Sequence, residues 1–246
     1  MNTNGNLYTI VYTAIIVVVV AGLLAAAAVF LKPSQQANIK AETISQMLQA
    51  AQFETDGLNN AQKLDKYAEE IDHAFTIDAN GAKVKDLGVS RDNIELVDGL
   101  KAQNYAIAGK SGFVLELPVY VFKNGVSIIP CYGAGLWGPV WGYIAIEADG
   151  TTIKGTYFDH DSETAGLGAR IKDDPAFRGQ FVGKKIAWSS KPQFEIIKGG
   201  APEGQENAID AISGATITSE GLDKAINTWL QAYEPYFSSI IKAEEE

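Results

Sequence analysis

An uncharged N-terminal stretch constrains this chain more than any other feature. The first 31 residues carry no charged side chain, and the segment 8–31 is apolar except for two threonines, one glycine and the tyrosine hydroxyls. A helix over this segment spans roughly 36 Å at about 1.5 Å per residue, against roughly 30 Å of hydrocarbon in a bilayer. We therefore expect residues 1–32 to form an N-terminal tail and a transmembrane anchor.

A cleaved secretory signal is the alternative interpretation of this stretch. The small residues Ala25 to Ala28 could hold a protease site. Signal sequences, however, carry a basic region before an apolar core of roughly 7–15 residues, and neither feature is present. A permanent anchor is the favoured interpretation.

The rest of the chain is acidic. Residues 32–246 hold all 30 acidic and all 20 basic residues, and so the whole net charge of -10. This balance disfavours nucleic acid as a partner. A segment of this length can bury one sizeable core and need not divide into independent domains.

The metal-binding residue types are scarce. One cysteine, Cys131, and two histidines, His73 and His160, are too few for an iron–sulfur cluster, a structural zinc site or an intrachain disulfide. Redox chemistry in this chain would need an organic cofactor. We expect Cys131 to be a buried inert thiol, and His160 to be a solvated or hydrogen-bonded loop residue that binds no metal.

The segment after the anchor has helical spacing. Apolar residues from Ile44 to Ala51 predict a stalk helix that begins at Pro33, and those from Leu64 to Phe75 predict a second helix. FTIDANG then resembles a strand that enters a turn. The segment 83–108 has mixed periodicity and receives no assignment.

From residue 113 the pattern becomes that of β-structure. Asn124-Gly125 and Asp149-Gly150 each lie between two apolar runs, which predicts two β-hairpins. DDPAFRGQF predicts a short helix with Asp173 or Asp174 as N-cap and Pro175 in its first position, and FEIIKGG predicts a further strand. The fold class is therefore α+β, a mixed α/β soluble domain with antiparallel hairpins behind one transmembrane helix.

The last helix has the clearest pattern. Its apolar stripe runs from Leu222 to Tyr233 at helical spacing, and we expect it to pack on the sheet. Thr218 or Ser219 is the expected N-cap, and Pro235 the expected end. The final glutamates, 244–246, are expected to be a solvated end.

The heptapeptide DAISGAT, residues 210–216, lies directly before this helix. Its small residues allow backbone N–H groups to approach an anion, and the helix start adds unpaired N–H groups and the positive end of the macrodipole. From the residues alone this is only a weak phosphate site, since many helices begin after Ser, Gly and Thr.

DAISGAT also resembles the covalent flavinylation motif of the FMN-binding domain family, namely Asp, two variable residues, Ser or Thr, Gly, Ala and Thr. This family includes the C subunit of the sodium-translocating NADH:quinone oxidoreductase and the G subunit of the Rnf complex. Its members carry FMN joined through phosphate to the final threonine by a flavin transferase. The resemblance implies that Thr216 bears covalent FMN, with four further motif residues around it: Asp210, Ser213, Gly214 and Ala215.

Two other segments strengthen the resemblance. YGAGLWGPVWGYIAI (132–146) is similar to a Gly- and Trp-rich loop of the family, and HDSETAGLGARI (160–171) to its Glu-Thr-x-Gly-Leu-Gly segment, with Ala165 where relatives often have proline. The glycines at 133, 135, 138 and 142 could leave room for a flat ring, although ordinary core packing would explain the first segment equally well. From the residues alone, a surface turn is the better interpretation of the second segment. The resemblance implies cofactor contacts from Leu136, Trp137, Glu163, Thr164, Gly166 and Leu167.

The implied function is electron relay through FMN within a membrane NADH:quinone oxidoreductase that pumps sodium. No catalytic residue and no metal ligand is expected in the chain, because the flavin supplies the chemistry. No G-x-G-x-x-G pattern follows a strand and opens a helix, so NADH should bind another subunit. We expect residues 33–110 to form the stalk and the first part of the soluble domain, and residues 111–246 the FMN-binding domain.

Two alternatives stay open for the function. The first is the G-type subunit of an Rnf complex, which the length and the GLWGPVWG loop disfavour. The second is an anchored ligand-binding module without redox activity. The implied partners are the other subunits, a flavin transferase and the membrane.

Two lines of argument give opposite predictions for the side of the membrane on which the soluble body lies. Lys32 and Lys40 follow the span and no basic residue precedes it, which favours a cytoplasmic body by the positive-inside rule. The resemblance implies the periplasmic side of the cytoplasmic (inner) membrane. Because Glu42 partly offsets the two lysines, we expect a single-pass protein with a periplasmic body.

Overall fold

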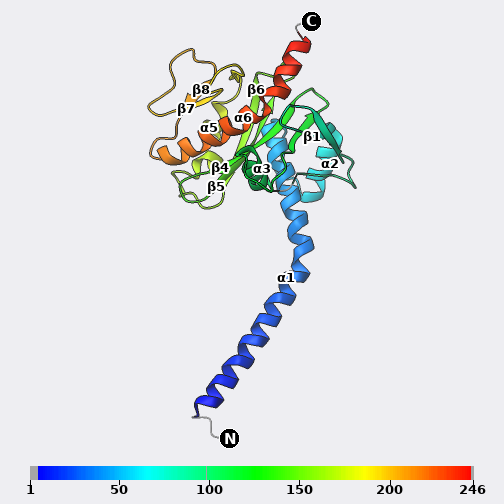
Figure 1. Cartoon of the computed structure of the whole chain (residues 1–246), viewed down its shortest axis with the longest axis vertical. Coiled ribbons are helices and arrows are strands. Elements are labelled where there is room, and N and C mark those ends of the chain that lie inside the picture. The colour runs from blue at the N-terminus through cyan, green and yellow to red at the C-terminus, as the bar shows by residue number, and fades with distance from the viewer. Residues whose placement is uncertain (1–4, 98, 245–246) are drawn as a thin grey trace. The chain divides into compact units, whose positions relative to one another are not determined.

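The structure is a computed structural model that describes residues 5–97 and 99–244 (Figure 1). It forms two compact units, Met1–Glu42 and Thr43–Glu246.

Helix α1 (Asn6–Ala50) begins the described chain. Its most apolar 18-residue window has a mean hydropathy of 3.0 and no part of it is buried by the rest of the chain, so α1 is long and apolar enough to cross a membrane. The expected apolar N-terminal helix is confirmed. The helix start predicted at Pro33 is wrong, because α1 passes through this proline. Proline removes one backbone hydrogen bond, and the remaining bonds of so long a helix continue on both sides.

The last turns of α1 belong to the core of the second unit and do not form a stalk. Ile44, Met47 and Leu48 are fully buried. They form one hydrophobic cluster with Tyr67 and Phe122. Their helical spacing therefore marks a packing face.

Helix α2 (Asn60–Glu70) begins with a capping box in which Asn59 and Gln62 bond each other's backbone N–H groups. The helix predicted as far as Phe75 is shorter, because Ile71 and Phe75 lie in strand β1 (Ile71–Ile77). The expected strand over FTI and the turn after it are confirmed.

The segment 83–108, whose periodicity is mixed, contains strand β2 (Lys83–Leu87) and helix α3 (Leu100–Ile107). Strands β3 (Leu117–Phe122), β4 (Ser127–Ala134), β5 (Pro139–Ile146) and β6 (Ile153–His160) follow. The sheet is antiparallel, with the order β2-β1-β3-β4-β5-β6.

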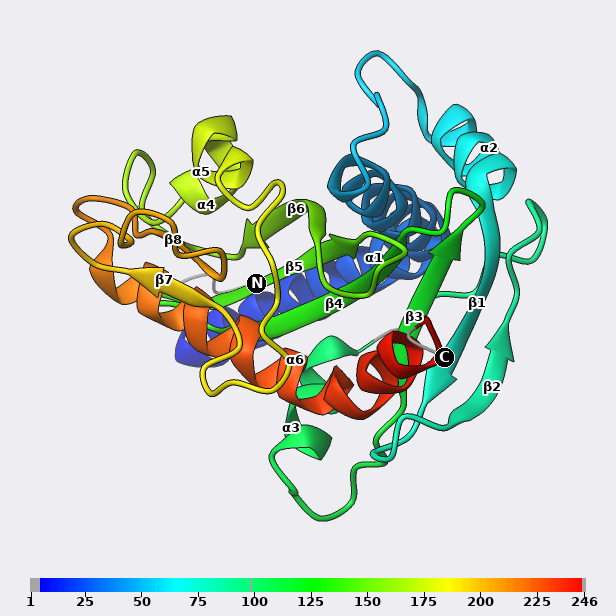
Figure 2. The same ribbon diagram turned by 90° about the horizontal axis from the view of Figure 1, so that it is seen from above.

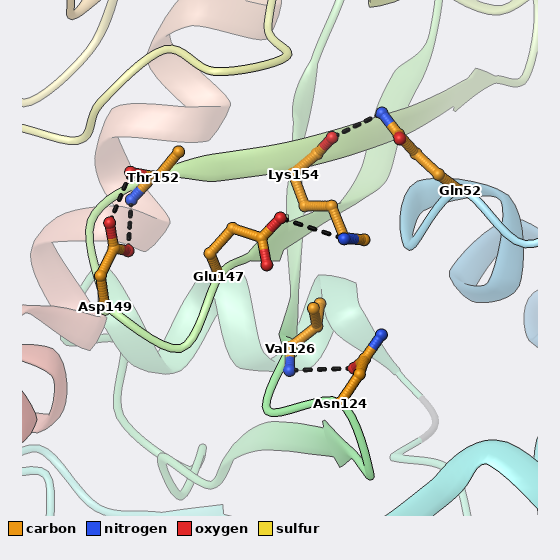
Figure 3. A network of polar contacts seen from close by, with 7 residues as sticks. All are labelled: Gln52, Asn124, Val126, Glu147, Asp149, Thr152 and Lys154. Carbon is orange, nitrogen blue, oxygen red and sulfur yellow. Dashed lines mark hydrogen bonds and ion pairs between the residues drawn. The ribbon is translucent and has the colours of Figure 1, made fainter.

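Both predicted hairpins are confirmed. Gly125 and Gly150 take φ values of +84° and +67° in the turns β3–β4 and β5–β6. Figure 3 shows how the neighbouring side chains close these turns. Asn124 accepts a bond from the Val126 N–H, and the carboxylate of Asp149 accepts bonds from the N–H and hydroxyl of Thr152.

The sheet has a hydrophobic cluster on each face. Neighbouring residues of a strand point to opposite faces, so Ile128 packs with the end of α1 whereas Ile129 packs with helix α6 (Thr216–Glu244). Figure 2 shows α6 running along the sheet. Two stretches of chain far apart in sequence therefore cover the two faces, and the α+β fold class is confirmed.

The short elements before α6 position its start. Helix α4 (Arg170–Asp173) is followed by α5 (Pro175–Gly179), whose predicted N-cap Asp174 accepts from the Ala176 N–H at 3.0 Å. The predicted strand FEII is present as β7 (Glu195–Ile197), which pairs in parallel with β8 (Ala208–Asp210).

The apolar stripe of α6 is buried as expected, from Leu222 to Tyr233. The end predicted at Pro235 is wrong, because α6 continues to Glu244. Phe237, which lies beyond the proline, is buried and stacks on Trp188, and this packing offsets the missing hydrogen bond. Of the glutamates expected as a solvated end, Glu244 is the last residue of α6, and Glu245 and Glu246 lie outside the described residues.

Candidate functional site

The loop that carries DAISGAT is a tight turn between β8 and α6. The N–H of Ala215 donates to the carbonyl of Ile212 at 3.0 Å, and Gly214 takes a φ of +83°. Asp210 ends β8, and its carboxylate accepts from the Ala201 N–H at 2.7 Å. Hydrogen bonds at both ends of the turn therefore fix its shape.

The accessible part of this loop is its centre. Asp210, Ser213 and Gly214 are exposed, Ala215 is buried and Thr216 is half-buried. Thr216 is the first residue of α6. The first N–H groups of a helix have no intrahelical acceptor, so the surroundings of its hydroxyl favour a negative charge.

The predicted N-caps of α6 have other roles. The hydroxyl of Thr218 donates to Oε2 of Glu163 at 2.5 Å, and the hydroxyl of Ser219 accepts from the Ile212 N–H at 3.1 Å. The cap prediction is wrong because α6 begins before both residues. Thr218 instead joins the helix start to a distant segment.

Glu163 holds three segments together. The residue is 7% exposed, and its Oε1 accepts from the Trp137 N–H at 2.8 Å while its Oε2 accepts from Thr218. Burial alone would raise the pKa of this carboxyl. Hydrogen bonds from the Thr218 hydroxyl and from the N–H groups of Trp137, Gly138 and Leu136 outweigh burial, and the pKa lies below its usual value. The group is therefore a carboxylate at neutral pH.

Two more bonds fix this arrangement. The N–H of Glu163 donates to Nδ1 of His160 at 3.2 Å, and the hydroxyl of Ser162 donates to the carbonyl of Trp137 at 3.1 Å. His160 is hydrogen-bonded as expected, although it lies at the end of β6 and not in a loop. The backbone of Trp137 is thus held on both its N–H and its carbonyl.

The glycines at 133, 135, 138 and 142 leave no free space in the direction in which a side chain would point. Side chains at Gly133 and Gly142 would collide with Ala225 and Phe158, and one at Gly138 would collide with Ser162. A side chain at Gly135 would meet the carboxylate of Glu163. The chain's own atoms therefore fill the space on the Cβ side of these glycines, and a ring would have to approach the backbone from another side.

Four apolar side chains near the helix start are exposed. Leu136 and Leu167 are each 44% exposed, Ile217 is 55% and Trp137 is 66%. Ordinary core packing is therefore excluded for Leu136 and Trp137. Leu167 lies against the DAISGAT turn, since a Cβ on Gly214 would be 3.2 Å from its Cδ2.

Thr164 and Gly166 lie in a surface turn beside these residues. Both are exposed, and the carbonyl of Thr164 accepts from the N–H groups of Leu167 and Ala169 at 3.1 Å. Gly166 has a φ of +73°. The turn places Leu167 next to Gly214.

Sequence reasoning missed two features of the site. The position of Thr218 near a helix start suggested a cap and gave no sign of its tertiary bond, and a cleft beside the turn had no sequence signal. The cleft has a volume of about 290 Å³. It is lined by Arg170, Asp174, Ala176, Phe177, Gln180, Ala211, Ile212 and Ser213.

The remaining candidates are inert. Cys131 is buried as expected, and burial raises the pKa of its thiol to about 12, with a small opposing contribution from the Gly142 N–H. Within residues 5–97 and 99–244, no group of three or more His, Cys, Asp or Glu could hold a metal ion.

Comparison with known proteins identifies the matching family and relatives. Residues 135–231 match the FMN-binding domain family. The chain is 32% identical over 244 residues to the C subunit of the Na(+)-translocating NADH-quinone reductase of Vibrio parahaemolyticus, with 89% of this chain and 88% of that protein covered. It is 31% identical over 230 residues to the same subunit of Vibrio vulnificus, with 89% of each chain covered.

Solved structures agree with these relatives. The crystal structure of the same subunit from Parabacteroides distasonis matches with a TM-score of 0.70 and 33% identity, over 85% of this chain and 97% of that one. The crystal structure of NqrC from Shewanella oneidensis matches with a TM-score of 0.65 and 27% identity, over 82% and 97%.

Proposed function

Because the chain belongs to the NqrC family, the C subunits of the Na(+)-translocating NADH-quinone reductase, we propose that it is a membrane-anchored flavoprotein subunit that relays electrons through FMN bound covalently to Thr216. Its complex would oxidise NADH, reduce quinone and export sodium. The relatives named above favour this assignment over the G-type subunit of an Rnf complex.

The observation that carries the proposal is the position of Thr216. Its hydroxyl lies at the start of a 29-residue helix, at the end of an exposed turn with the sequence DAISGAT. A phosphoester there would place its negative charge beside the unpaired N–H groups of the helix, which stabilise anions by roughly 0.3–1 kcal/mol at exposed sites. The exposure of Asp210 and Ser213 supports recognition of the turn by a flavin transferase.

The exposed apolar residues supply a surface for the flavin ring. Leu136 and Trp137 would lie on one side of the phosphoester link at Thr216, and Leu167 and Ile217 would lie beside that link. An apolar patch of this kind on a soluble domain commonly marks a binding site. The Glu163 carboxylate would keep the Trp137 loop in place beside the cofactor, and Thr164 and Gly166 would shape the turn behind Leu167.

When bound, FMN supplies the electron transfer, accepting electrons from one redox centre and passing them to another. The chain's own residues bind and orient it. The anchor would hold the domain within reach of partner subunits. One of those subunits would carry the NADH site.

We place the protein in the cytoplasmic (inner) membrane with its soluble domain on the periplasmic side. The apolar window of α1 supports the anchor, and the resemblance of the DAISGAT loop to flavinylated proteins supports the side. A protease-protection assay on spheroplasts tests this placement. Digestion of the soluble domain is expected, and a protected domain would refute the periplasmic side.

Purification after co-expression with a flavin transferase tests the proposed function. The protein should be yellow, retain its flavin after denaturation and show reversible bleaching with dithionite. Protein that lacks covalently held flavin would instead favour the anchored module without redox activity. Expression without the transferase is the control and should give colourless protein.

A further inference from the structure

A buried carboxylate joins three elements at the end of β6. Asp159 is 6% exposed, and it accepts from Nε2 of Gln46 at 2.9 Å and from the His160 N–H at 2.8 Å. Nζ of Lys172 lies 2.9 Å from its Oδ1. The contacts come from the end of α1, from α4 and from β6 itself.

These partners explain how the carboxylate tolerates burial. Burying a charge costs free energy unless the charge is paired and hydrogen-bonded. Removing one partner leaves part of the buried charge uncompensated. Asp159 has a cation, a side-chain amide and a backbone N–H around it. The end of β6 is therefore fixed relative to the last turns of α1 and to α4.

The next residues along the chain lead directly to the candidate site. Nδ1 of His160 accepts from the Glu163 N–H, and the Glu163 carboxylate holds both Trp137 and Thr218. A continuous set of bonds thus runs from Gln46 in α1 to the loop and helix that flank Thr216.

We propose that Asp159, together with Gln46 and Lys172, positions the flavin site without touching the cofactor. It acts through His160 and Glu163, which set the conformation of the Trp137 loop and of the start of α6. This inference rests on the proposed function. It gives the buried end of α1 a role in positioning the cofactor site, in addition to its role in the core.

The opposite end of β6 offers a matched control. There, Nζ of Lys154 pairs with Oε1 of Glu147 at 3.0 Å, and the Lys154 carbonyl accepts from Gln52, which follows the end of α1 (Figure 3). This pair lies where the chain leaves β5 and enters β6. Lys154 is near the first residue of β6, whereas Asp159 is near the last.

The test uses the full chain co-expressed with a flavin transferase. Asp159→Ala, Asp159→Asn and Glu147→Ala are compared by visible circular dichroism of the bound flavin, by the rate of flavinylation and by Tm. We expect Asp159→Ala to change the dichroism and to slow flavinylation on the order of two- to tenfold. Asp159→Asn should give values between those of Asp159→Ala and wild type, because its amide oxygen still accepts from the His160 N–H or from Gln46 while the charge pairing with Lys172 is lost. Glu147→Ala should leave both unchanged.

A wild-type dichroism spectrum and flavinylation rate in Asp159→Ala, with only Tm lowered, would overturn the inference. If Asp159→Ala does not fold, Gln46→Leu and Lys172→Met each remove one partner and should shift the same two readouts. Unchanged readouts in both would also overturn it. Wild-type protein that takes up no flavin would instead refute the proposed function, so the two failures are distinguishable.

Discussion

The hydroxyl of Thr218 lies 2.5 Å from Oε2 of Glu163, a residue 55 positions earlier in the chain. This bond connects the start of α6 to the segment that holds the Trp137 loop. Thr218→Val keeps the shape of the side chain and leaves a buried carboxylate oxygen without its donor. We expect the free energy of unfolding to fall by about 1–3 kcal/mol and flavinylation to slow.

Thr218→Ser is the control for this change. It keeps the hydroxyl and should retain most of the stability and the flavinylation rate. Urea denaturation and a time course of flavin fluorescence on denaturing gels measure the two effects. Equal behaviour of the valine and serine variants would contradict the role given to the bond.

The low pKa of Glu163 predicts an acid-dependent loss of stability. A carboxyl with a folded-state pKa below its unfolded value of about 4.3 stabilises the fold fully above that value. This stabilisation is lost as pH falls through the folded pKa. Glu163→Gln should therefore be less stable than wild type at pH 7, and the difference should shrink below about pH 4.

Denaturation curves collected between neutral and acid pH test this expectation. Asp149→Asn is the matched control, because hydrogen bonds from Thr152 and Thr151 outweigh burial and lower the pKa of Asp149 too, but at a turn without site residues. Both substitutions should reduce the fall in the free energy of unfolding between neutral and acid pH. Only Glu163→Gln should change the rate of flavinylation. A pH-independent difference between Glu163→Gln and wild type would refute the pKa argument.

Gly214 should be intolerant of a side chain for two separate reasons. Its φ of +83° strains an L-residue, and a Cβ would approach Leu167 at 3.2 Å. Gly166 has a similar φ of +73°, but no described atom lies within 4 Å of a Cβ there. Gly214→Val should therefore block flavinylation and Gly166→Val should not, although each should lose about 1–2 kcal/mol of stability to backbone strain.

The intact mass of both variants, measured after co-expression with a flavin transferase, shows whether each carries FMN. A flavinylated Gly214→Val protein would show that the turn tolerates displacement of Leu167.

The place of α1 in the core predicts where the anchor can be removed. A protein that starts at Ser34 keeps the buried residues Ile44, Met47 and Leu48, and it should be soluble, folded and flavinylated. A protein that starts at Phe53 loses them and exposes the facing side of the sheet, so it should aggregate or unfold. Circular dichroism and size-exclusion chromatography compare the two. An equally well-folded shorter protein would contradict the core role of α1.

Local turn chemistry was readable from the sequence. Asn124-Gly125 and Asp149-Gly150 predicted both hairpins because glycine adopts positive φ without strain. The stripe of the last helix predicted its packing, since an apolar face at helical spacing must be buried against something. The helix boundaries predicted at Pro33 and Pro235 are wrong. Both helices continue through the proline, because flanking turns and packing compensate for one lost hydrogen bond.

Long-range contacts were not readable. Ile71 and Phe75 fit a helical spacing, yet pairing with β3 places them in a strand. Thr218 is a residue type typical of an N-cap, and only the fold shows that its partner is Glu163. Contacts of Leu136, Trp137 and Leu167 with FMN were expected mainly from a resemblance, and they stay a prediction.

The central claim is that Thr216 alone bears the flavin. Its most direct test is peptide mass mapping of the fluorescent band after co-expression of the full chain with a flavin transferase. We predict one modified peptide that carries FMN phosphate on Thr216, and a dark but folded Thr216→Ala protein, with Thr164→Ala as the fluorescent control. A fluorescent Thr216→Ala protein, or a modified peptide without Thr216, would contradict the account.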